Sequence, residues 1–250
     1  MPTREDLIVP DTTSIAPNVP QYLLPRQVAA PDGPVDTRMM YAMHFAFRRD
    51  LEMFAAAAVA TPYDDRDAWR ALAQCWELFS KNLLHHHRGE DAGLWPLLLD
   101  HADASERSVL QDMEAEHAQI DPVLERCAAG FEVVQVSPDG VVAERLARDL
   151  RAARQCLDGH LRHEETAAMA MVQKYLTTEQ WDAMAKQHFG KGQSFRDLLA
   201  TLPWVAYEMP TAELDGLVKQ AGRPFAVLLR LTRGRFERRH ALATRYLAPS

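Results

Sequence analysis

Residues 72–97 read LAQCWELFSKNLLHHHRGEDAGLWPL, and this stretch decides the fold. Its apolar residues recur every three or four positions, which is the spacing of one face of an α-helix. The face comprises Leu72, Trp76, Phe79 and Leu83, with Leu94 and Leu97 beyond. His86 and Glu90 occupy the positions at which this apolar pattern lapses. The stretch therefore predicts a helix that begins near Asp67, buries an imidazole beside a carboxylate, and ends or kinks at Pro96.

Three other segments repeat this arrangement, because each aligns a histidine with an apolar helical face. These helices are expected at about 36–60, from Asp103 or Ser105 to Gly130, and from a Ser137-Pro138 cap to Tyr175. The inward residue of the first predicted helix of the chain is His44. Those of the third are His117 and Asp121, and those of the fourth are His160 and Glu164. Each of the four predicted helices thus directs a histidine inward, and two of them add a glutamate one turn later.

The composition predicts a helical protein, because 37 Ala and 29 Leu stand against only 3 Ile and 16 Val. Long helices joined by short loops predict an all-α fold, an up-and-down four-helix bundle with a C-terminal helical extension. We expect the bundle at residues 37–176 and the extension at 177–250, where Thr177 and Gln180 resemble a capping box. Residues 1–36 contain seven prolines and predict an extended arm. Residues 131–140 read as a connector with room for a short strand at 133–136.

Charge is unevenly distributed along the chain. The net charge is −7, but the seven Arg and one Glu of residues 223–245 give that end +6 and leave about −13 for the rest. This balance argues against a nucleic-acid-binding chain, and the basic end contains no nucleic-acid-binding motif. We expect these arginines to form a solvated helix face against the acidic bundle. Contact with an anionic lipid surface, nucleic acid or an acidic partner is the alternative.

The sequence predicts a protein of the reducing cytoplasm. Cys75, Cys127 and Cys156 are scattered without a C-x-x-C pair, so no disulfide framework is expected. The first residues lack the basic and apolar regions of a signal peptide. The longest apolar run, residues 54–60, is far too short to span a membrane.

The inward carboxylates need compensation, because a buried charge is costly unless it is paired or bound to metal. Glu90 and Glu164 would repel each other in one core, and cations at its centre would remove this repulsion. Histidine nitrogens and carboxylate oxygens without thiolate suit iron or manganese, and a bridging glutamate from each of two helices suits two ions. Asp121 is either a further ligand or the acceptor that orients His117. We expect the neighbouring polar residues to face solvent, namely His85, His87, His163, Asp91, Glu165, Glu114 and Glu116.

This ordered set resembles the hemerythrin-like (HHE cation-binding) domain family over about residues 36–175. Its local signatures are His86-His87-Arg88-Gly89-Glu90-Asp91, Glu116-His117-Ala118-Gln119-Ile120 and His160-Leu161-Arg162-His163-Glu164-Glu165. The resemblance implies a left-handed four-helix bundle around an oxo- or hydroxo-bridged pair of non-heme iron ions. In that family Glu90 and Glu164 would bridge the irons, and His44, His86, His117 and His160 would be terminal ligands.

The sequence departs from the oxygen-carrying hemerythrins, which have two histidines four residues apart on the third helix. Asp121 stands at the second of those positions, or Met113 if the spacing is counted backward from His117. The fourth helix has His160-x-x-x-Glu164 where those proteins have His followed by Asp five residues on. Fewer imidazoles and more carboxylate oxygens favour Fe(III), which argues against bulk O₂ transport. We expect sensing, redox or detoxification chemistry with O₂, NO or hydrogen peroxide. An enzyme of this kind would be a diiron oxidoreductase acting on one of these molecules.

Two alternatives belong to other functional classes. A ferritin-like diiron oxidase or iron-handling protein needs Glu-x-x-His on two helices, and only Glu114-x-x-His117 fits. A helical binding module would use the basic C-terminal end, with the bundle as its support.

Overall fold

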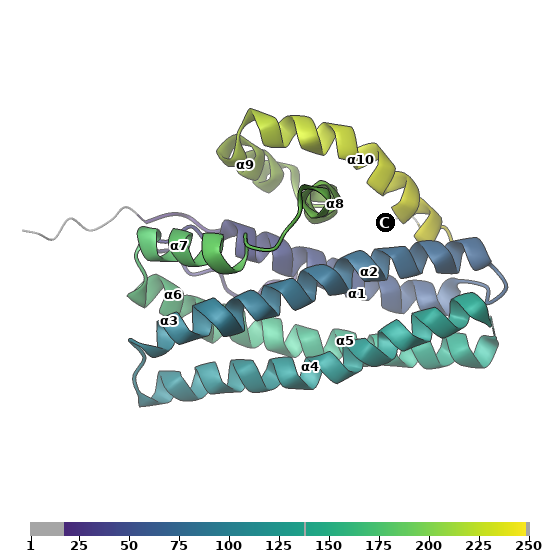
Figure 1. Cartoon of the computed structure of the whole chain (residues 1–250), viewed down its shortest axis with the longest axis horizontal. Coiled ribbons are helices and arrows are strands. Elements are labelled where there is room, and N and C mark those ends of the chain that lie inside the picture. The colour runs from purple at the N-terminus through teal and green to yellow at the C-terminus, as the bar shows by residue number, and fades with distance from the viewer. Residues whose placement is uncertain (1–17, 138, 249–250) are drawn as a thin grey trace, which may run out of the picture.

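The structure is a computed structural model that describes residues 18–137 and 139–248. Within these ranges the regular elements are helical, and the β-type pairing is an isolated bridge between Val19 and Gly33. Four long helices lie along the long axis of the molecule, and successive helices reverse direction (Figure 1). They are α1 (Arg38–Ala60), α2 (Arg66–Gly89), α4 (Ala104–Val136) and α5 (Gly140–His163). No helix of the described ranges is both long and apolar enough to cross a membrane.

Aspartate side chains begin three of the long helices by accepting hydrogen bonds from backbone N–H groups of the first turn. These caps are Asp65 to Ala68, Asp103 to Ser105 and Glu106, and Asp139 to Val141. The predicted Ser137-Pro138 cap is therefore replaced by Asp139. Ser137 instead ends α4, and Pro138 lies outside the described residues.

Gly130 does not end α4, contrary to the sequence-based prediction. The helix continues to Val136, so residues 133–136 are helical and form neither a strand nor a connector. A Cβ atom at Gly130 would lie 2.9 Å from Cδ1 of Leu146. The missing side chain therefore lets α5 approach α4 closely, and this glycine serves helix packing.

A π-helical turn follows two of the long helices at matching positions. Segment η1 (Glu90–Leu94) joins α2 to α3 (Trp95–Leu99), and η2 (Glu164–Ala168) joins α5 to α6 (Met169–Tyr175). Both turns begin at a glutamate of the inward face. In η1 the N–H of Trp95 donates to the carbonyl of Glu90, five residues back. This wider turn accommodates Pro96, which lacks a donor, and the chain stays helical to Leu99.

Two apolar clusters fill the bundle on either side of the inward histidines. One contains Phe47, Phe54, Trp76, Phe79 and Phe131, and the other contains Tyr41, Leu94, Trp95 and Met169. The ring of His86 lies 5.2 Å from that of Phe47, and the ring of His117 lies 6.3 Å from that of Trp95. The histidines therefore contact both apolar clusters and are removed from bulk water.

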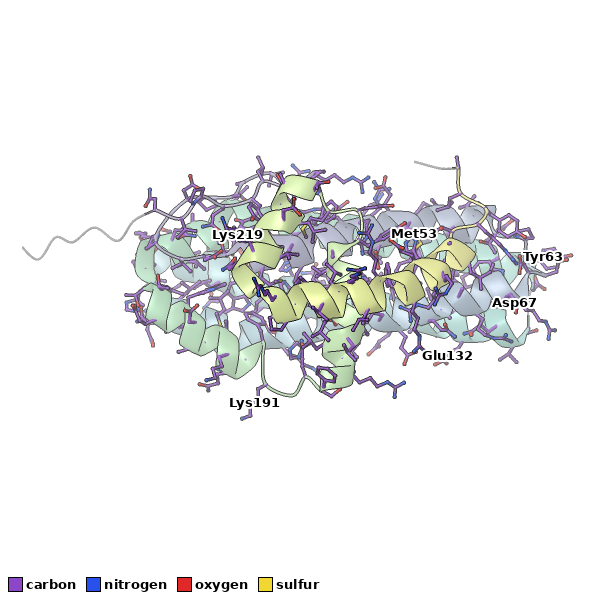
Figure 2. The ribbon with its side chains drawn as sticks, turned by 90° about the horizontal axis from the view of Figure 1, so that it is seen from above. Met53, Tyr63, Asp67, Glu132, Lys191 and Lys219 are labelled. Carbon is purple, nitrogen blue, oxygen red and sulfur yellow. The ribbon has the colours of Figure 1, made fainter. Side chains whose placement is uncertain are left out.

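The C-terminal extension covers the side of the molecule formed by α1 and α2 (Figures 1 and 2). Its helices are α7 (Thr178–His188), α8 (Phe195–Ala206), α9 (Thr211–Ala221) and α10 (Arg223–Ala243). The predicted capping box of Thr177 and Gln180 is confirmed at the start of α7. Buried polar contacts fix α8 on α1. The indole N–H of Trp204 donates to Asp50 at 2.7 Å, and Arg49 donates to the carbonyls of Trp204 and Tyr207 at 2.9 and 2.6 Å.

Residues 18–37 run over the bundle without forming a helix. The side chain of Gln27 donates to the carbonyl of Tyr41 at 2.7 Å, and the N–H of Val35 donates to Gln173 at 3.0 Å. These hydrogen bonds tie the described part of the predicted arm to α1 and α6. Residues 1–17, the other part of that arm, lie outside the described residues.

Candidate metal centre

Seven buried side chains gather inside the bundle in two groups that share Glu90. Within each group, one potential ligand atom of every side chain lies within 4.8 Å of the others. The group that we call the His87 group comprises His87, Glu90, His117 and His160. The group that we call the His44 group comprises His44, His86, Glu90 and Glu164. Helices α1, α2, α4 and α5 each supply at least one imidazole, and the turns η1 and η2 supply the two carboxylates.

Both glutamates reach across the two groups. Oε1 of Glu90 lies 3.0 Å from Nε2 of His86, whereas its Oε2 lies 3.6 Å from Nε2 of His117. Oε2 of Glu164 lies 3.2 Å from Nε2 of His44 and 3.9 Å from Nε2 of His160. Each carboxylate therefore faces imidazoles of both groups, as a ligand shared by two cations would.

Six polar atoms of this centre lack the hydrogen-bond partners that buried groups ordinarily have. Among the described residues, both oxygens of Glu90, both oxygens of Glu164 and both ring nitrogens of His87 are buried without a hydrogen bond. The Nε2 atoms are also crowded in pairs, with 3.2 Å between those of His44 and His86. Converging lone pairs of nitrogen and oxygen in a buried site fit metal cations, which would satisfy all of these atoms at once.

Carboxylates behind the centre hold the opposite ring nitrogens of three histidines. The Nδ1–oxygen pairs are His44 with Glu165 at 3.2 Å, His117 with Asp91 at 2.8 Å, and His160 with Glu116 at 2.8 Å. With the proton on Nδ1, each imidazole donates outward and turns the lone pair of Nε2 inward, the orientation a metal ligand needs. Asp91 and Glu165 each directly follow a shared glutamate in the sequence.

Glu165 is fully buried and is held by more than one partner. Nη2 of Arg48 donates to its Oε2 at 3.2 Å while Nη1 donates to Oε1, and the N–H of Val28 donates to Oε2 at 3.1 Å. Burial acts to raise the pKa of Glu165, but the hydrogen bonds and charges of His44 and Arg48 outweigh it and lower the pKa. Glu165 therefore stays an ionised acceptor for His44, and the N-terminal arm contacts it directly.

Burial and the close approach of charged groups strongly shift the pKa values at the centre. Burial lowers the pKa of His86 to about 3, and repulsion by His44 adds to this shift. Burial would also lower the pKa of His44, but Glu164 and Glu165 outweigh it and raise that pKa to about 10. Burial and the adjacent Glu164 raise the pKa of Glu90. The raised pKa values mean that His44 and Glu90 hold protons that a metal cation would displace. Metal binding is therefore expected to release protons.

The structure brings together six of the seven ligands named from the sequence: His44, His86, Glu90, His117, His160 and Glu164. Asp121 joins neither group, and its side chain is exposed. The buried face of α4 continues from His117 through Ile120 and Leu124, so position 121 turns toward solvent. Glu114 is exposed as well, and the Glu-x-x-His motif of the ferritin-like alternative does not reach the centre.

The expectation that His87 and Glu165 face solvent is wrong, because their exposed fractions are 3% and 0%. The ring of His87 lies flat on that of His117, with 4.0 Å between centroids and 11° between planes. His87 thus becomes buried through the approach of α4, which local helical periodicity does not report. A signal for Glu165 was present, since Glu90-Asp91 and Glu164-Glu165 are matching acidic pairs and both second members hold a histidine.

The C-terminal extension contacts the centre through Phe189, the residue after α7. Its ring stacks on the ring of His86 with 5.9 Å between centroids, and its carbonyl lies 2.6 Å from Nε2 of half-buried His85. Gly89 makes this approach possible, because a Cβ atom there would lie 2.3 Å from the Phe189 ring. The extension and the metal-binding side chains are therefore in direct contact.

Comparison with known families agrees with this geometry. Residues 35–172 match the sequence model described as the hemerythrin HHE cation binding domain. The matched range is more than half of the chain and contains all seven side chains of the two groups. Searches among curated proteins and among solved structures gave no match. The chain belongs to the hemerythrin HHE cation-binding domain family.

Proposed function

We propose that this is a non-heme diiron protein of the hemerythrin type, with its four long helices as an up-and-down bundle around two iron ions. The observation that carries the proposal is the position of Glu90, whose two oxygens face imidazoles of different groups at 3.0 and 3.6 Å. His44 and His86 would hold one ion, His87, His117 and His160 would hold the other, and Glu90 and Glu164 would be shared.

The donor set and its surroundings suit a reactive iron site. With both glutamates shared, one ion would have four donor side chains and the other five, so ions with octahedral preference keep room for a small external ligand. Iron would supply one-electron chemistry and the affinity for O₂, NO or hydrogen peroxide. Phe47 and Trp95 are almost fully buried beside the histidines and exclude bulk water and large substrates.

We propose sensing, redox or detoxification chemistry with one of these small molecules. With His87 included and Asp121 exposed, the centre offers five imidazoles and two carboxylates, so the low imidazole count expected from the sequence is not observed and carries no argument against O₂ transport. Glu165, Asp91 and Glu116 hold the Nδ1 protons of three histidines and keep these rings in the inward-facing tautomer when the charge of the centre changes. The three cysteines are free, as expected for a protein of the reducing cytoplasm.

Iron content and the absorption spectrum of the freshly purified full chain test this proposal. We expect about two iron ions per chain, as in carboxylate-bridged helical bundles. We also expect ferric charge-transfer absorption that changes on anaerobic reduction and on addition of NO or hydrogen peroxide. Absence of stoichiometric iron after anaerobic loading with Fe(II) would overturn the proposal.

Two substitutions with the same charge change supply the control. Glu90→Gln weakens a carboxylate that both ions would share, so iron should be lost from the whole centre. Asp121→Asn removes a charge from an exposed position four residues after His117, and both ions should remain. Loss of iron from Asp121→Asn would show that Asp121 is an iron ligand.

A further inference from the structure

Helix α10 lies over the outer side of α2 and α8, on the face from which Figure 2 is viewed. A groove of about 750 Å³ opens between these three helices. It is lined by Asp67 and Arg70 of α2, by Arg196 and Leu199 of α8, and by Leu231, Arg235, Arg238, Arg239 and Leu242 of α10, among others. The groove is separate from the candidate metal centre, because none of its lining residues belongs to either metal-binding group.

The charged side chains that line this groove are predominantly positive. Five arginines line it against one carboxylate, Asp67, which lies 3.3 Å from Arg70 in an exposed ion pair. The other four arginines form no ion pair within residues 18–137 and 139–248. The basic end of the chain meets an acidic carboxylate of the bundle elsewhere, where Arg245 pairs with Asp65. The groove therefore concentrates positive charge on a chain whose other residues are acidic overall.

Aliphatic side chains lie among the guanidinium groups, together with the polar side chains of Gln74 and Thr232. Leu231 is 73% exposed and Leu242 is 36% exposed, and Leu199 and Ala200 lie on the opposite wall. Phe236, the aromatic residue of the lining, is 5% exposed and offers no face for stacking of a nucleic-acid base. Exposed leucines beside guanidinium groups without carboxylate partners match a ligand that is anionic at one end and apolar along its length.

We propose that this groove binds a single amphipathic anion, with a phosphate or carboxylate head on the arginines and an aliphatic body along the leucines. Guanidinium groups bind both head groups through paired, charge-assisted hydrogen bonds. Arg235 and Arg238 lie on the same helix as Leu231, so one ligand reaches both kinds of wall. This binding site is independent of the iron centre proposed above.

Dodecyl phosphate, titrated calorimetrically below its critical micelle concentration into the full chain, is the probe. The variant Arg235→Gln/Arg238→Gln should bind it at least about tenfold more weakly, as expected for lost hydrogen bonds to a charged group. The matched control is Arg223→Gln/Arg230→Gln on the same helix, with the same charge change at exposed positions outside the groove. The control should keep its affinity within about twofold. An equal loss in both variants would overturn the proposal, because it would reduce the effect to diffuse charge attraction.

The contribution of the apolar wall is tested at exposed positions, where substitutions are expected to change the unfolding free energy little. Leu231→Asn should weaken dodecyl phosphate binding and leave inorganic phosphate binding unchanged. Val227→Asn, one turn earlier, 56% exposed and outside the groove, should change neither. Inorganic phosphate that binds as tightly as dodecyl phosphate, or octyl glucoside that competes equally well, would overturn the proposed ligand class. Vesicles of phosphatidylglycerol show whether the ligand is a membrane lipid or a free molecule. Co-sedimentation that depends on Arg235 and Arg238 supports a lipid in a bilayer. Binding of dodecyl phosphate without co-sedimentation supports a free amphiphile.

Discussion

His160 and His163 are three residues apart on α5, yet they meet different surroundings. His160 is 2% exposed and turns Nε2 into the centre, whereas half-buried His163 bonds Glu116 at 2.9 Å. We expect His160→Ala to lose iron together with its charge-transfer absorption. His163→Ala should retain the iron, because Glu116 still holds His160. Iron per chain and the absorption spectrum decide this, and the reverse outcome would show that the ligand assignment on α5 is wrong.

Arg48 supports the centre from outside the metal-binding groups by neutralising Glu165. Arg48→Met would remove the guanidinium from a fully buried carboxylate and leave it only His44 and the Val28 N–H, which is expected to cost about 3–5 kcal/mol of unfolding free energy. The control is Arg26→Met, which removes an exposed pair with Glu52 and should cost no more than about 1 kcal/mol. Urea denaturation of both variants, iron-loaded and chelated, measures the difference. Similar small losses in both variants would contradict a structural role for the buried pair.

At the scale of elements, the contact between the end of α2 and Phe189, the residue after α7, depends on a glycine without room for a side chain. Gly89→Ala places a methyl group against the Phe189 ring, so α7 must shift and the unfolding free energy should fall by about 1–3 kcal/mol. Gly159→Ala is the matched helical control, because its added Cβ would meet no atom within 4 Å other than its neighbours and the backbone of its own helix. That variant should gain about 0.5–1 kcal/mol through its higher helix propensity. Thermal denaturation and limited proteolysis near Phe189 test the pair, and equal stability of the two variants would contradict the close contact.

At the scale of the whole molecule, the C-terminal extension is bound to the bundle through a buried polar and aromatic contact. Trp204 packs on Phe47 with 5.5 Å between ring centroids and donates to Asp50. A fragment ending at Leu176 should therefore expose apolar surface and aggregate, while keeping some iron because every proposed ligand precedes the cut. Size-exclusion chromatography and iron content of the fragment test this. A monomeric and fully stable fragment would show that residues 177–250 form an independent module.

Much of the fold and of the candidate metal centre could be predicted from the spacing of apolar residues along the sequence, because this spacing determines which residues share a helix face. That spacing placed His44, His86, His117 and His160 in line with buried apolar residues. It could not place His87, whose burial comes from stacking on a ring of another helix. Nor could it reveal the partnership of Glu165 with Arg48, two residues 117 positions apart. The predicted helix end at Gly130 was wrong for the same reason, because this glycine allows close packing of α4 and α5, which local spacing does not reveal.

Two of the three orienting carboxylates cross between the α1–α2 pair and the α4–α5 pair of helices. Glu165, next to α5, holds His44 of α1, and Asp91, next to α2, holds His117 of α4. Neither pair of helices therefore supplies, by itself, all the ligands and orienting carboxylates of one ion. The first ion to bind would fix Glu90 and Glu164 in place and spare the second ion that ordering cost. During titration with sub-stoichiometric iron, the population should therefore divide into empty and fully loaded chains, with half-filled chains scarce at every point.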